Sequence, residues 1–174
     1  MIPLLHRLNE AEIPLCLFFN RMSHVQLINR FFATISRLGD GIFWYVLMLI
    51  LPPLYGVQGL EAALHMLLTS TVVLGVYKLL KTNTHRIRPF HYDEKIFQNV
   101  PALDQFSFPS GHTMHAVSFS IVLLSYFPQF AWLVIPFTFF VALSRVVLGL
   151  HYPSDVIAGV LLGTFLAIIS LTLT

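Results

Sequence analysis

Charged residues are scarce in this sequence. Only 10% of its 174 residues are Asp, Glu, Lys or Arg, whereas a soluble domain carries about 25%. Hydrophobic residues make up 56%, and the mean hydropathy is +0.77. This composition excludes an ordinary soluble globule, and it excludes an intrinsically disordered chain, which needs high charge and low hydrophobicity. The sequence therefore predicts an integral membrane protein.

Cysteine and a strong excess of either charge are also lacking. Cys16 is the single cysteine, so an internal disulfide is excluded and the redox compartment cannot be inferred. The net charge of +2 is too small to indicate a nucleic-acid partner. The length fits one domain, residues 1–174.

Long apolar runs are what the sequence has in abundance. A spanning helix needs ~20 mostly apolar residues, and the segments that qualify are 41–60, 62–80, 111–127, 129–148 and 154–173. Pro52 and Pro53 are expected to kink or shorten the first segment. The predicted fold class is all-α, a polytopic helical bundle with about five transmembrane helices. Gly159 and Gly163 form a small-xxx-small pattern, interpreted as close packing within the monomer; the oligomeric state is not predicted.

Two segments lie outside these runs. Residues 1–40 place arginines between recurring apolar residues, which predicts one or two amphipathic helices lying in the membrane interface. The alternative is a sixth span across 11–36. Residues 82–109 form the one long connection and mix charged with aromatic side chains, which is typical of a functional loop at the headgroup level.

Polar residues gather in three clusters at the ends of the predicted spans. Because adjacent spans alternate in direction, all three clusters are expected at one membrane face, and ionisable residues there indicate function. The clusters lie at the end of the second span, at the start of the third, and between the fourth and fifth: Lys81 and Arg88; Ser110, Gly111 and His112; Arg145, His151 and Asp155.

The first two clusters, together with Arg145 of the third, favour binding of a phosphate. Ser110 is a good N-cap, and the glycine after it lets an anion approach the free N–H groups of a helix N-terminus. Lys81, Arg88 and Arg145 supply three cations, and arginine matches phosphate oxygens with two parallel hydrogen bonds. A carboxylate ligand would need fewer cations.

The third cluster favours nucleophilic catalysis. If a helix starts near His151, Asp155 lies on the same face and can accept a hydrogen bond from one ring nitrogen. That leaves the other nitrogen free to attack, with His112 as general acid for the leaving oxygen. No carboxylate cluster with a third ligand is evident, so neither a metal nor a cofactor is expected.

Three neighbouring residues are open to two interpretations. His115 lies three residues after His112 and either joins the site or packs within the bundle. His85 and Arg86 lie between Lys81 and Arg88, where a contact with a lipid headgroup is one hypothesis.

These residues form a three-part signature. Six residues separate Lys81 from Arg88-Pro89, Pro109 precedes Ser110-Gly111-His112, and Ser144-Arg145 is followed by His151 and Asp155. Every fixed position resembles the signature of the phosphatidic acid phosphatase type 2 superfamily, over roughly residues 60–174. The residues before this range carry no motif.

The resemblance implies metal-independent hydrolysis of a phosphate ester or anhydride through a phosphohistidine in a membrane helical bundle. It implies that His151 is the nucleophile, Asp155 its orienting partner and His112 the general acid. The phosphate would be held by Lys81, Arg88, Ser110, Gly111 and Arg145. The substrate is then a lipid phosphate or diphosphate in the bilayer, such as undecaprenyl diphosphate, phosphatidylglycerol phosphate, phosphatidic acid or lipid A 1-phosphate.

Two alternatives share these residues: a lipid phosphotransferase, and a non-catalytic protein that binds or translocates lipid phosphates. Pure binding does not require an oriented nucleophile, which argues against the non-catalytic protein. A phosphotransferase shares the phosphohistidine with a phosphatase, so the sequence does not separate these two.

The resemblance further implies a bacterial inner membrane with the site on the periplasmic face. The charges point the other way, because basic residues concentrate on the site's side and the positive-inside rule makes that side cytoplasmic. These residues are Arg7, Arg21, Arg30, Arg37, Arg86 and Lys95.

Overall fold

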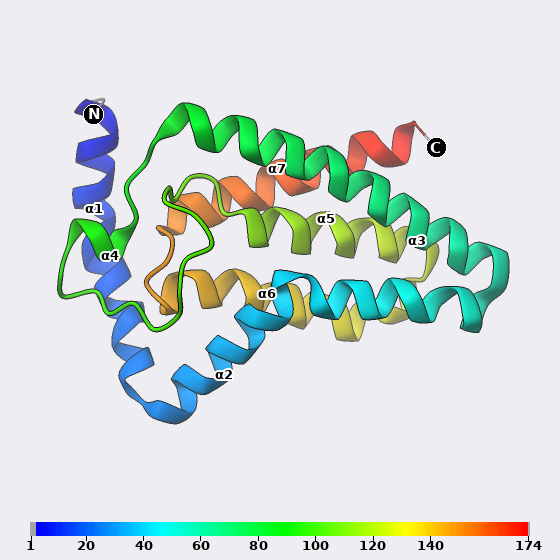
Figure 1. Ribbon diagram of the computed structural model, residues 1–174, viewed down its shortest axis with the longest axis horizontal. Helices are drawn as coiled ribbons and strands as arrows, with labels where there is room; N and C mark the ends of the chain where they lie inside the picture. The colour runs from blue at the N-terminus through cyan, green and yellow to red at the C-terminus, as the bar shows by residue number, and fades with distance from the viewer. Residues whose placement is uncertain (1–2, 174) are drawn as a thin grey trace.

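The computed structural model describes residues 3–173, and this part of the chain is built from helices. The long helices run side by side along the molecule, and α1 (Pro3–Asn20) lies across one end of them (Figure 1). The all-α prediction is confirmed. The helices that run side by side are α3 (Phe43–Thr84), α5 (Gly111–Tyr126), α6 (Ala131–Val147) and α7 (Pro153–Thr172).

The element α3 is a hairpin of two arms (Figure 1). Gly56 has φ 59° and ψ −133°, a conformation that leaves the helical path and that glycine adopts without steric cost. Pro52 and Pro53 come just before it and lack the N–H that a continuing helix needs. A Cβ on Gly59 would lie 2.1 Å from the carbonyl oxygen of Leu51, so the chain turns back tightly between these residues. The predicted segments 41–60 and 62–80 correspond to the two arms.

The predicted count of five spans is not confirmed. Within residues 3–173, three segments are long and apolar enough to cross a membrane: Gln26–Thr84, Pro128–Val147 and Pro153–Thr172. The first includes both arms of α3, and the other two match the predicted segments 129–148 and 154–173. The segment 111–127 forms α5, whose 16 residues extend about 24 Å, short of the ~30 Å hydrocarbon core. Because α5 packs against α3, α6 and α7, protein rather than lipid surrounds most of it.

The N-terminal segment forms two helices rather than one. A 3-10 turn, η1 (Arg21–His24), and the extended residue Val25 separate α1 from α2 (Gln26–Arg37). The alternative of one continuous span across 11–36 is therefore wrong. Asn20 fixes the break, because its side-chain amide donates to the carbonyls of Phe97 and Val147 (both 3.0 Å) and accepts from the Phe97 N–H (2.8 Å).

The close approach of α7 to α5 sets the position of the polar end of the bundle. A Cβ on Gly159 would lie 2.8 Å from the Ser110 carbonyl oxygen, and one on Gly163 would lie 2.6 Å from that of Met114. The small-xxx-small pattern therefore serves packing within the monomer, as predicted. It brings the start of α5 next to the start of α7.

The tight turn of α3 predicts a large cost for a side chain at Gly59. Gly59→Ala should lower the stability by about 1–3 kcal/mol, the scale for overpacking, because the added carbon meets backbone rather than a movable side chain. Thermal unfolding in detergent measures the effect.

Gly75→Ala is the matched control on the same helix, because a Cβ there has open space around it. Alanine is the better helix former by about 1 kcal/mol, so this variant should unfold at or above the wild-type temperature. Equal unfolding temperatures for the two variants would contradict the proposed turn.

Candidate active site

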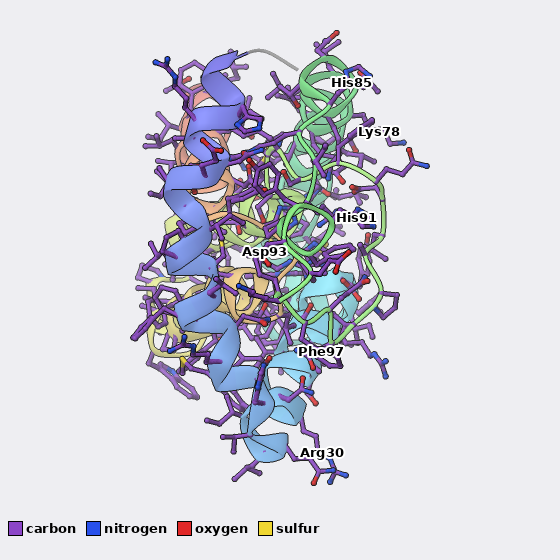
Figure 2. The ribbon with its side chains drawn as sticks, turned by 90° about the vertical axis from the view of Figure 1, so that its left-hand side faces the viewer. Arg30, Lys78, His85, His91, Asp93 and Phe97 are labelled. Carbon is purple, nitrogen blue, oxygen red and sulfur yellow. The ribbon has the colours of Figure 1, made fainter. Side chains whose placement is uncertain are left out.

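A cavity of about 240 Å³ opens at the end of the bundle where α3 and α6 end and α5 begins. Figure 2 views the molecule from this end, with α1 on one side and the connection that carries His91, Asp93 and Phe97 on the other. The three sequence clusters meet here, because the lining includes Lys81, Arg88, Gly111, His112, Arg145 and His151. Ser110 and Asp155 are fully buried behind this lining.

His151 lies in the turn between α6 and α7. The N–H groups of Leu150 and His151 both donate to the Arg145 carbonyl (3.0 Å each), so the chain folds back and brings the arginine and the histidine to one cavity. The ring is 2% exposed, and its Nε2 lies 3.3 Å from Nη1 of Arg88. Burial, and then the positive charges of Arg88 and Arg145, hold the pKa of His151 well below its ordinary value. A neutral imidazole keeps a lone pair on one of its two ring nitrogens.

The predicted contact between Asp155 and His151 is looser than a hydrogen bond. Asp155 Oδ2 lies 3.7 Å from Nδ1 of His151, and within residues 3–173 this nitrogen has no hydrogen-bond partner. The helix starts at Pro153 rather than near His151, so Asp155 is its third residue. There Oδ2 accepts the N–H of the N-cap residue Tyr152 at 2.9 Å.

Arg86 is the partner of Asp155 that the sequence did not predict. Its Nη1 donates to Asp155 Oδ1 at 2.6 Å and to Ser154 Oγ at 2.7 Å, and its guanidinium stacks on the Tyr152 ring at 4.0 Å. With 2% of its surface exposed, Arg86 lies inside the protein, so the hypothesis of a headgroup contact is wrong.

The same guanidinium ties α1 to the site. Its Nε donates to Asn9 Oδ1 at 2.9 Å and its Nη2 to Glu12 Oε1 at 3.2 Å. Glu12 also accepts the N–H and the hydroxyl of Ser154, at 2.9 and 2.7 Å. The N-terminal helix therefore holds the first turn of α7, although it carries no motif.

His112 also has a partner that the sequence analysis missed. Its Nε2 contacts the carboxylate of Asp40, which lies in the π-helical turn η2 (Leu38–Ile42) between α2 and α3. A lone acidic residue between Gly39 and Gly41 at the edge of an apolar run was the available signal. The contact orients the ring in the cavity wall.

The cations Lys81 and Arg88 converge on a carboxylate that was not predicted for the site, Asp104. The Lys81 Nζ lies 2.7 Å from Oδ1 and 2.8 Å from Oδ2, and Arg88 Nη2 lies 2.8 Å from Oδ1. The hydroxyl of Tyr77 also donates to this carboxylate. Burial raises the pKa of Asp104, but the hydrogen bonds from Lys81 and Tyr77 outweigh it and hold the pKa at about 2. Asp104 is therefore an anion.

The remaining predicted phosphate ligands differ in accessibility. Arg145 is 3% exposed, and its Nη1 donates to Ser36 of α2, while its Nε has no hydrogen-bond partner within the described residues. The Ser110 hydroxyl pairs with that of Thr113 at 2.9 Å, and its N–H donates to the Asp155 carbonyl at 3.1 Å. Ser110 thus joins α5 to α7 and does not face the cavity.

His115 lines the cavity, and its Nδ1 binds the Gly111 carbonyl at 2.9 Å, which combines both interpretations offered for it. His85 is exposed beside Phe106. Among residues 3–173, no group of three or more His, Cys, Asp or Glu side chains is arranged to hold a metal ion.

Comparisons with known proteins agree with this geometry. The family model described as the PAP2 superfamily matches residues 62–174, more than half of the chain. The chain belongs to the PAP2 superfamily. This is the family whose signature the sequence resembles, and membership confirms the predicted enzyme class, a lipid phosphatase.

Individual relatives cover different shares of this PAP2 protein. An undecaprenyl-diphosphatase from Sulfolobus acidocaldarius is 27% identical over 149 residues, which are 85% of this chain and 71% of that protein. A lipid A 1-phosphatase from Rhizobium etli is 34% identical over 109 residues, 60% of this chain. That match spans 47% of the rhizobial protein, so this chain corresponds to about half of it.

A solved structure shares the fold. The PAP2-type phosphatidylglycerolphosphate phosphatase from Bacillus subtilis superposes with a TM-score of 0.76 over 99% of this chain and 87% of that one. The sequence identity is 24%, so the likeness extends to the fold. The three segments of residues 3–173 that are long and apolar enough to cross a membrane support the assignment of this PAP2 protein as an integral membrane protein.

The network around Arg86 predicts a stability effect. Arg86→Ala leaves the fully buried Asp155 without the cation that pairs with it, which should cost roughly 3–5 kcal/mol, the scale for breaking a buried pair. The unfolding temperature in detergent should fall by many degrees. Arg7→Ala removes an exposed arginine of α1 that lies outside this network, so this control should unfold with the wild type. An Arg86 variant that unfolds at the same temperature as this control would mean that the stability does not depend on the Arg86–Asp155 pair.

Proposed function

We propose that this PAP2 protein removes a terminal phosphate from a lipid phosphate or diphosphate through a phosphohistidine on His151. The observation that carries the proposal is the position of His151. Its Nε2 lies 3.3 Å from Nη1 of Arg88, and the neutral ring lines the cavity together with Arg145 and His112. A protein that only binds lipid phosphates has no need of a buried, neutral histidine among cations.

In the proposed reaction, His151 Nε2 attacks phosphorus, so that a P–N bond forms and the bond from phosphorus to the leaving oxygen breaks. His112 transfers a proton to that oxygen from the ring nitrogen that Asp40 does not hold. Water then attacks the phosphohistidine and yields its proton to His112, which releases phosphate and regenerates both histidines. Arg88 and Arg145 stabilise the charge on the equatorial oxygens throughout. The chain's own residues supply every step, without a metal.

Apolar residues in the cavity support a lipid substrate. Tyr45 and Leu74 line the cavity and are also 54% and 40% exposed on the outside of the bundle. An acyl or prenyl chain can therefore leave the cavity between the two arms of α3 and remain in the bilayer. The candidate substrates are the undecaprenyl, phosphatidylglycerol, phosphatidic acid and lipid A phosphates, and two of these classes appear in the names of the relatives.

The test is phosphate release from this panel of lipids in detergent with EDTA present. The wild type should hydrolyse at least one lipid, and His151→Ala should lower kcat by roughly 10³-fold or more, the scale for loss of a nucleophile. His91→Ala, an exposed change at the same end of the molecule, is the matched control. Activity of the His151 variant within tenfold of wild type would reject the nucleophile.

We further propose that the protein lies in a bacterial inner membrane with this site on the periplasmic face. Arg86 is paired with Asp155 inside the protein, so it no longer counts as a free positive charge on that side. Lys95 is exposed and provides the test, because it lies in the chain between Asp93 and Phe97, which Figure 2 shows at this end. A membrane-impermeant maleimide should label Lys95→Cys in intact cells whose outer membrane is permeabilised, while the wild type stays unlabelled because Cys16 is buried. Labelling only after lysis would place the site in the cytoplasm.

A further inference from the structure

We infer that Asp104 competes with the substrate for the phosphate pocket. Its carboxylate binds Lys81 and Arg88 in the free protein, and the incoming phosphate displaces it. This inference rests on the proposed function, because it concerns how the same pocket binds phosphate. Asp104 lies in the connection between α4 (Pro89–Tyr92) and α5. Under this inference it sets the affinity of the enzyme for its substrate and for its phosphate product.

The ammonium group of Lys81 is held by Asp104 and Tyr77. Nζ lies 2.7 and 2.8 Å from the two Asp104 oxygens and donates to the Tyr77 hydroxyl at 2.9 Å. The position beside Lys81 that a phosphate oxygen would take is therefore occupied by the Asp104 carboxylate.

Arg88 is engaged in the same way. Its Nε donates to the backbone carbonyl of Asp104 at 3.0 Å, and its Nη2 donates to the side chain of Asp104 at 2.8 Å. Its Nη1 donates to the Leu150 carbonyl at 2.7 Å. The edge of the guanidinium that carries Nε and Nη2 is therefore turned to Asp104. This is the edge whose two parallel N–H groups would otherwise bind a phosphate.

Exposure indicates which partner moves. The side chains of Lys81 and Arg88 are 8% and 2% exposed, whereas that of Asp104 is 29% exposed. Asp104 also lies on an irregular segment next to Leu103, which is 70% exposed. The cations are therefore fixed by the bundle, and the carboxylate can rotate toward water.

The exchange has a physical rationale on both sides. Without an anion, Lys81 and Arg88 would be unpaired in a largely buried site, which is strongly unfavourable. A phosphate ester brings more negative charge than a carboxylate and outcompetes it. After hydrolysis, the returning carboxylate opposes retention of inorganic phosphate and favours its release.

The experiment compares Asp104→Asn with the wild type, each in a His151→Ala background so that binding is measured without turnover. Inorganic phosphate and orthovanadate are the probes, titrated against the unfolding temperature in detergent. The Asp104 variant should bind both anions about tenfold more tightly, a change of ~1.4 kcal/mol. In the active background, its KM should fall and product inhibition by phosphate should rise. Glu94→Gln, an exposed change on the same connection, removes the same charge away from the cations and should leave affinity unchanged.

Three results would overturn the inference. Weaker anion binding in Asp104→Asn would show that the carboxylate orients the cations for phosphate. Affinities within twofold of wild type would show that phosphate binds elsewhere. Failure of both Asp104→Asn and the smaller Asp104→Ala to fold would make Asp104 a structural counter-ion. A wild type that hydrolyses no lipid of the panel would reject the proposed function instead, and the anion titrations would still decide the role of Asp104.

Discussion

Compensation of buried positive charge is the constraint on which this architecture depends. The proposed phosphate pocket places cations at the end of an apolar bundle, where an unpaired charge is strongly unfavourable. The chain has only eight acidic residues. Four of them contact Lys, Arg or His side chains at this end of the bundle: Glu12, Asp40, Asp104 and Asp155. Charged residues are few in this sequence, and half of the acidic ones are placed where they pair with buried cations or histidines.

The segments without motifs supply most of this compensation. Glu12 comes from α1, Asp40 from the turn before α3, and Asp104 from the long connection. The signature residues converge because the helices alternate in direction and because the glycines of α7 press against α5. Their charges are stable there because three separate segments bring carboxylates to them. This explains why α1 is part of the catalytic end even though none of its residues belongs to the signature.

The sequence predicts what is local and repetitive, and it misses pairings between distant residues. Apolar runs predict the helices, and alternation predicts that Lys81, His112 and His151 share one end. The two apolar runs predict the turn of α3 several residues too late. The backbone bends at Gly56 and at the Leu51–Gly59 contact, not at the boundary between the runs. The pairs Arg86–Asp155 and His112–Asp40 join residues about 70 positions apart, and no local spacing encodes them. The spacing of His151 and Asp155 predicts a shared face, but the later helix start gives Asp155 a capping role first.

That capping role bears on the proposed chemistry. Hydrogen bonds from Arg86 and from the Tyr152 N–H hold the Asp155 side chain in place. The neutral His151 ring has an unpaired Nδ1 that lies 3.7 Å from Asp155 Oδ2. A phosphorylated imidazole carries positive charge, and its Nδ1–H becomes a stronger donor. A carboxylate oxygen accepts more than one hydrogen bond, so a small movement of the ring closes the gap as the charge develops. Under the proposed mechanism, Asp155 therefore interacts more strongly with the intermediate than with the resting histidine, and this difference is what accelerates a reaction.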